Sequence, residues 1–92
     1  MSRAFVREDD HDPGQEYRLP APDSPYYREA SAWALIQGAD IGDSRSAERA
    51  TGFRWGDPLL TGEVQAILER AESEGQDRVA QLARRFLRAA KG

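Results

Sequence analysis

The chain contains no cysteine, which removes two common ways of stabilising a small protein. Neither a disulfide bond nor a zinc site with thiolate ligands can form. With 92 residues the chain forms one domain at most, and a domain of this size buries only about 60 to 65% of the surface that its unfolded chain exposes. The packing of helices must therefore stabilise a small core.

Long hydrophobic runs are also missing. The longest strongly apolar stretch covers residues 30–36, far fewer than the roughly 20 residues that a membrane span needs. The mean hydropathy of −0.76 is polar even for a soluble protein. The first residues contain no apolar signal core. We therefore expect a cytoplasmic protein without membrane contact, part of which does not pack.

The residues and motifs that enzymes commonly use for catalysis are also missing. The chain has one histidine, His11, and no glycine-rich phosphate-binding loop. The run of residues 8–12 (EDDHD) offers oxygen ligands but lacks the glycine-pinned loop of a calcium hand, so it is interpreted as a solvated acidic segment. The sequence predicts a protein that is not an enzyme and has no cofactor and no metal site.

Residues 1–23 are predicted to form a flexible arm ahead of a helical domain at residues 24–92. The acidic run is followed by Pro13-Gly14 and by Pro20-Ala21-Pro22, and neither helical nor strand periodicity extends through this composition. Carboxylates repel one another and prolines remove backbone donors, so we expect the arm to be extended or mobile until a partner orders it.

Start and stop signals predict four helices in the rest of the chain. The first is expected from Ser24-Pro25 to about residue 37, and the second, short one at residues 44–51. The third starts at Asp57-Pro58 or at the rival Thr61, and the fourth starts near residue 77. The expected stops are Gly38, Gly52 and Gly75.

Apolar residues at helical spacing predict an all-α bundle of three longer helices and one short one. In the first helix the stripe begins at Tyr26 and Tyr27, with Leu35 or Ile36 at its margin, and the last two helices are expected to form an antiparallel hairpin. The aromatic residues of the connector are expected to cover the core. The predicted core consists of Tyr27, Ala30, Trp33, Ala34, Phe53, Trp55, Leu60, Val64, Ile67, Leu68, Val79, Leu82, Ala83, Phe86 and Leu87.

Basic residues gather at the end of the last helix: Arg84, Arg85, Arg88 and Lys91. They form a candidate contact for an acidic surface of a protein or of RNA. Complementation of the helix dipole is the alternative interpretation. Phe53, Arg54 and Trp55 combine residue types that are enriched at binding hot spots, although such residues more often close a core.

The opening residues Met1 to Asp10 (MSRAFVREDD) resemble the N-terminal leader of some bacterial Gre-type transcript-cleavage factors, which bind RNA polymerase. The resemblance implies a bacterial protein that shares a partner with these factors and uses Arg3, Phe5, Val6 and Arg7 as a docking tag. The coiled coil and the β domain of that family have no counterpart after Asp10, so cleavage stimulation is not inferred.

We therefore expect a regulatory or adapter protein that binds a protein partner, RNA polymerase among the candidates. Two other hypotheses remain open. Nucleic-acid binding through the basic end of the last helix is disfavoured by the formal net charge of −3, and the acidic third helix is a poor recognition helix. Self-association through an uncovered apolar face would give a weak homodimer in place of a monomer.

Overall fold

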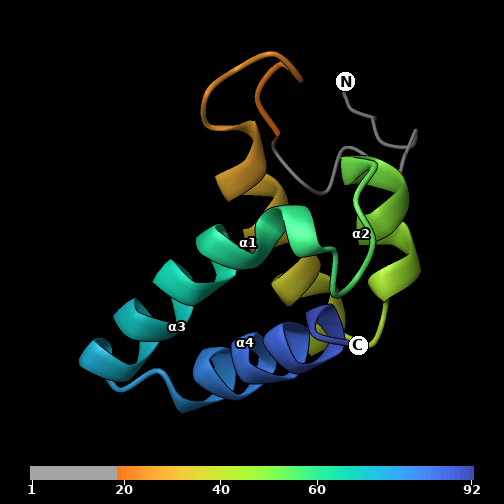
Figure 1. Cartoon of the computed structure of the whole chain (residues 1–92). Coiled ribbons are helices and arrows are strands. Elements are labelled where there is room, and N and C mark those ends of the chain that lie inside the picture. Colours follow the sequence, from red (N-terminus) through yellow and green to blue (C-terminus); the bar gives the residue numbers. More distant parts are fainter. Residues whose placement is uncertain (1–18) are drawn as a thin grey trace, which may run out of the picture.

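A computed structural model describes residues 19–92, which form four α-helices and no strand (Figure 1). The helices are α1 (Tyr27–Asp40), α2 (Ser44–Thr51), α3 (Thr61–Glu74) and α4 (Asp77–Ala90), and a single 3₁₀ turn, η3 (Pro58–Leu60), precedes α3. The predicted all-α class, with three longer helices and one short helix, is confirmed. The expectations for residues 1–18 of the arm lie outside the described residues.

Local sequence signals set most helix boundaries. The Asp43 carboxylate accepts a hydrogen bond from the Ser46 backbone N–H at 3.3 Å and caps α2, while Gly52 ends that helix in the left-handed conformation. Gly75 ends α3 in the same conformation. Each of these three residues has the role that the sequence predicts.

The two proline-containing start signals lie a few residues ahead of the helices that they announce. Ser24 belongs to a turn, in which its hydroxyl accepts from the Tyr26 N–H at 3.1 Å, and α1 begins at Tyr27. Asp57 accepts from the Leu59 N–H at 3.0 Å and caps η3, so the rival residue Thr61 is the first residue of α3.

The predicted stop of the first helix at Gly38 is wrong. Gly38 is buried inside α1, and the helix continues to Asp40. Gly42 ends it at φ +77°: its N–H donates to the Ala39 carbonyl at 3.2 Å, and the Asp43 N–H donates to the Gly38 carbonyl at 2.7 Å. These two bonds satisfy the last carbonyls of the helix, a pattern that needs a left-handed residue after the helix end.

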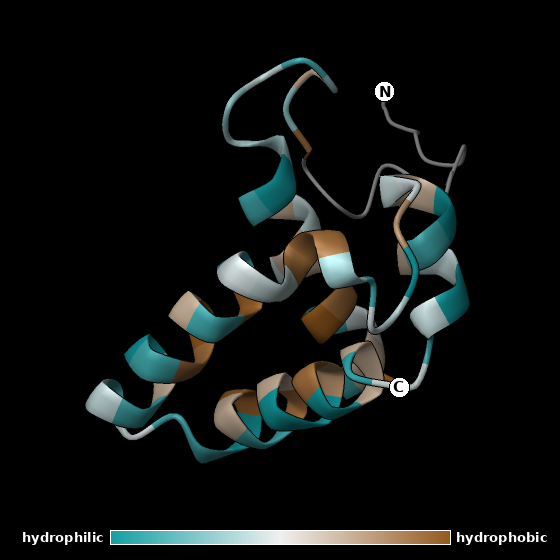
Figure 2. Cartoon of the chain, viewed as in Figure 1, coloured by the Kyte–Doolittle hydropathy of each residue, from teal (hydrophilic) through white to brown (hydrophobic). Residues whose placement is uncertain are grey.

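Helices α3 and α4 form the predicted hairpin, and α1 packs against both of them as well as against α2 (Figure 1). In Figure 2 the apolar segments of α3 and α4 face each other, and polar segments line their outer sides. Because α1 has neighbours on several sides, its buried face is wider than the single predicted stripe. Leu35 and Ile36, expected at the margin, are at most 2% exposed, whereas Tyr26 is 68% exposed.

The remaining core assignments divide into two groups. Seven predicted residues are buried: Ala34, Leu60, Val64, Ile67, Leu82, Ala83 and Phe86. Six are half-buried and pack against this cluster: Trp33, Phe53, Trp55, Leu68, Val79 and Leu87. Tyr27 and Ala30 are also only half-buried. The expectation that connector aromatics cover the core is confirmed. The Trp55 ring packs edge-on against the Phe86 ring, with 4.9 Å between the ring centroids.

Ser31 is a polar residue on the buried face of α1. Its side chain is fully buried, and its hydroxyl has no hydrogen-bond partner among the described residues. A buried hydroxyl without a partner costs about 1 to 3 kcal/mol, and alanine is also the better helix former. We therefore expect Ser31→Ala to raise the free energy of unfolding by about 0.5 to 2 kcal/mol in a urea titration. A loss of stability would show that the hydroxyl is bonded in solution.

Candidate functional site

The basic end of α4 is an exposed surface. Arg84, Arg85, Arg88 and Lys91 are all exposed, and their spacings of three and four residues make them neighbours along one side of the helix. Like charges at such spacings repel one another, and only the negative end of the helix dipole offsets that repulsion within the helix. We call this set the basic face.

One member of the basic face is engaged inside the fold. The Arg84 Nη2 donates to the Glu72 Oε2 at 2.7 Å, which links α4 to α3. Both side chains are about half exposed, so this ion pair contributes little to stability. For Arg85, Arg88 and Lys91 no ion pair is found within residues 19–92. Among the described residues, these three cations are the unpaired part of the basic face.

The helix beside the basic face has the opposite charge. Helix α3 contains four glutamates, Glu63, Glu69, Glu72 and Glu74, against one arginine, Arg70, a net charge of −3. Because α3 and α4 are antiparallel neighbours, Glu69, Glu72 and Glu74 lie toward the start of α4, and Glu72 reaches Arg84. The end of α4 is thus a local group of cations on a hairpin whose other helix has a negative net charge.

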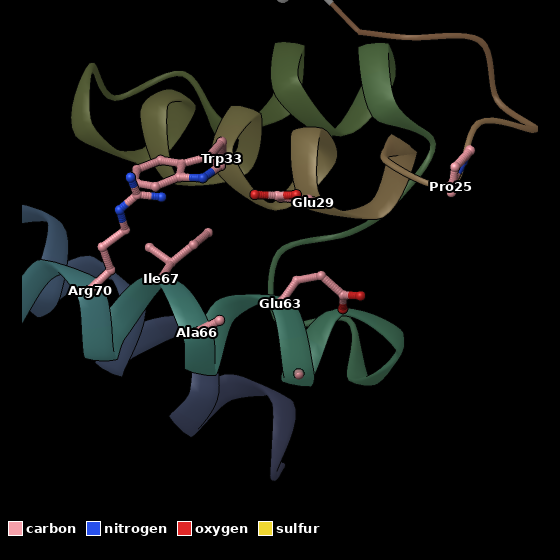
Figure 3. Close-up of a pocket in the computed structure, with 8 residues that line it drawn as sticks. Pro25, Glu29, Trp33, Glu63, Ala66, Ile67 and Arg70 are labelled. Atoms are coloured by element: carbon pink, nitrogen blue, oxygen red, sulfur yellow. The ribbon is translucent and has the colours of Figure 1, made fainter.

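A second candidate site is a groove between α1 and α3, with a volume of about 400 Å³ (Figure 3). Buried Ile67 and half-buried Trp33 supply apolar surface. The full lining is Pro25, Glu29, Trp33, Gly62, Glu63, Ala66, Ile67 and Arg70. This volume is within the range of small ligand pockets, about 300 to 1,000 Å³.

The two walls of the groove each present a carboxylate. Glu29 lies on α1 and Glu63 on α3, and in Figure 3 the Arg70 side chain extends toward the Trp33 ring at the other end of the groove. Arg70 is also paired with Glu74 through its Nε at 3.3 Å. The charged groups of the groove are therefore two carboxylates at one end and one guanidinium at the other, with the apolar surface of Trp33 and Ile67 beside the guanidinium (Figure 3).

Comparison with protein-family models, curated proteins and solved structures found no match. The resemblance of the leader to Gre-type factors therefore stays a prediction, and its residues Arg3, Phe5, Val6 and Arg7 lie outside the described part of the chain. Within residues 19–92 no group of three or more histidine, cysteine, aspartate or glutamate side chains is placed to hold a metal ion. None of the helices in that range combines the length and apolar character needed to cross a bilayer.

Sequence reasoning missed the groove. Trp33 is predicted as core, but its half-buried ring lines the groove instead of being enclosed. Glu29 is exposed on α1, and no pattern in the sequence pairs it with Glu63, which lies 34 positions later. Only the crossing of α1 over α3 brings these two carboxylates to one opening (Figure 3).

The hot-spot interpretation of Phe53, Arg54 and Trp55 finds little support in the structure. The centroids of the Phe53 and Tyr27 rings lie 6.2 Å apart, and the backbone N–H of Trp55 donates to the Glu48 Oε2 at 2.8 Å. Both aromatic side chains are held against the core, and only Arg54 is exposed. These residues act as a lid on the bundle, the alternative that the sequence left open.

Proposed function

We propose that this protein is a non-catalytic adapter that binds an acidic surface of a protein partner through the basic face of α4. The supporting observation is the group of exposed cations at Arg85, Arg88 and Lys91, which lack ion pairs within residues 19–92. An acidic ligand would relieve their mutual repulsion. The leader resemblance makes bacterial RNA polymerase the first partner to test, with Arg3, Phe5, Val6 and Arg7 as a second point of contact.

Binding to RNA polymerase provides the test. We expect the intact chain to bind the purified enzyme, and the double substitution Arg85→Glu/Arg88→Glu to weaken binding about tenfold, since each exposed pair contributes about 0.2 to 1 kcal/mol and reversal replaces attraction with repulsion. Removal of residues 2–12 is expected to weaken binding separately. Biolayer interferometry at two salt concentrations measures both effects, and both should shrink at high salt.

The matched control is Arg49→Glu on α2, an arginine that is likewise exposed but lies outside both the basic face and the groove. It should leave the affinity for the polymerase within about twofold of the native value. Equal binding by the native chain and the Arg85→Glu/Arg88→Glu variant would disprove the role of the basic face. Tighter binding to a duplex DNA probe than to the polymerase would establish the nucleic-acid alternative instead.

A further inference from the structure

The groove between α1 and α3 has opposite charges at its two ends. The carboxylates of Glu29 and Glu63 lie at one end, and the guanidinium of Arg70 lies at the other (Figure 3). Within residues 19–92 neither of these carboxylates has an ion pair. Arg70 pairs with Glu74 on its own helix, yet its side chain remains 68% exposed. Each end of the groove can therefore accept an opposite charge from another molecule.

The two charges on α3 are complementary to each other. Glu63 and Arg70 are seven residues apart, so they lie on one side of the helix, about 10 Å apart along its axis. When a second α3 lies beside the first in the opposite direction, a two-fold axis midway between the two residues places Arg70 of each copy against Glu63 of the other. Glu29 adds a second carboxylate at the end that receives the arginine. A second copy of this chain thus has the charge order that the groove requires.

We propose that the groove is a dimer interface, in which two copies of the chain pack their α3 helices antiparallel. Small residues allow the close approach. Ala66 is exposed and lies midway along the groove, next to the two-fold axis, and a side-chain carbon added at Gly62 would meet no atom within 4 Å. The space at Gly62 receives the Trp33 ring of the second copy, which is half-buried in the single chain and lies beside Arg70. The dimer covers the charged ends and the apolar surface of the groove together.

Sedimentation velocity of the full chain tests the proposal. Exposed ion pairs contribute little, so the dimer is weak and forms as the protein concentration rises. Every substitution acts at two equivalent contacts, because the interface is two-fold symmetric. We expect Glu63→Arg and Arg70→Glu each to raise the dissociation constant of the dimer about tenfold. A native chain that stays monomeric at its highest soluble concentration would overturn the proposal.

An equimolar mixture of these two variants is the sharpest sample. In a mixed dimer of the Glu63→Arg chain with the Arg70→Glu chain, an arginine again faces a glutamate at both contacts. We therefore expect the mixture to dimerise about as tightly as the native chain, although each variant alone does so poorly. Variants that do not restore each other in the mixture would contradict the antiparallel arrangement.

The matched controls are Glu69→Arg on α3 and Arg49→Glu on α2. They make the same two charge changes at exposed residues that do not line the groove. Each should leave the dissociation constant of the dimer within about twofold of the native value. An equal loss of dimer in these controls and in the groove variants would assign the effect to net charge and overturn the proposal.

A disulfide cross-link locates the two-fold axis. The chain has no cysteine, so Ala66→Cys introduces one thiol at the middle of the groove. A disulfide needs the two Cβ atoms within about 4.5 Å, so this variant should form a linked dimer about tenfold faster than Gln65→Cys, whose exposed position lies outside the groove. Equal rates would overturn the proposed axis. No partner protein is present, so these outcomes are independent of the binding proposed for α4.

Discussion

Replacement of Phe86 by alanine is expected to lower the free energy of unfolding by about 3 to 5 kcal/mol, the cost of removing a large ring from a core. Phe86 is fully buried on α4 and packs edge-on against Trp55. The aromatic pair itself adds about 0.5 to 1.5 kcal/mol beyond the buried area. A domain of this size has a total stability on the order of 5 to 14 kcal/mol, so the loss is a large fraction.

Urea titration followed by helical circular dichroism measures this effect. The control is Leu87→Ala on the next position of α4, where the side chain is only half-buried and the loss should be clearly smaller. If the Phe86→Ala chain does not fold, Phe86→Leu keeps most of the volume and should give an intermediate midpoint. An unchanged midpoint in either Phe86 variant would show that α4 does not pack as described.

Replacement of Gly56 by alanine is expected to be the second large loss, about 2 to 4 kcal/mol. Gly56 has a φ of +81°, and a side-chain carbon there would lie 2.7 Å from the Ala89 Cβ and 3.2 Å from the Ala89 backbone carbon. The left-handed conformation alone costs a residue with a side chain about 1 to 2 kcal/mol. The remainder is the displacement of α4, because the backbone contact cannot be relieved by a rotamer change.

Gly52→Ala separates the two contributions. Gly52 has nearly the same φ, +80°, but a side-chain carbon there meets no atom within 4 Å. Its substitution should therefore cost only the conformational part. Adding Ala89→Gly to Gly56→Ala should recover part of the difference, since it removes the closest contact. Equal midpoints for Gly52→Ala and Gly56→Ala would rule out a tight contact between the connector and α4.

The sequence is sufficient to predict the helices and most of the core, because helix caps, glycines and the spacing of apolar residues are local signals. Asp43, Gly52 and Gly75 each follow such a signal. Gly38 and Gly42 offer the same signal four positions apart, and burial against the rest of the bundle decides between them. That burial depends on tertiary contacts, which no local pattern contains.

The width of a buried helix face was also not predictable. A single stripe on the first helix assumes one packing partner, but α1 has neighbours on several sides, which buries Leu35 and Ile36. Leu68, by contrast, fits the apolar periodicity of α3 yet remains half-buried. Its replacement by alanine should therefore cost less than that of Phe86, although both residues belong to the predicted core.

Candidate sites differ in the same way. The basic face follows directly from four residues on one helix, and its exposure is as the periodicity indicates. The groove depends on Glu29 and Glu63, which belong to different helices, so it is visible only in three dimensions (Figure 3). The residues of a site within one helix can be predicted from their spacing in the sequence. A site between two helices can be predicted only when the way the helices cross is known.

The close approach of Gly56 to Ala89 fixes the helix end that displays Arg85, Arg88 and Lys91. Cations on a mobile tail lose backbone freedom when they bind, at about 1 to 2 kcal/mol for each residue that becomes ordered. Cations on a helix that is already packed lose only side-chain conformational entropy when they bind, about 0.5 to 1.5 kcal/mol for each side chain. In the binding that we propose for the basic face, this contact at Gly56 would lower the entropic cost of holding an anionic ligand several residues away.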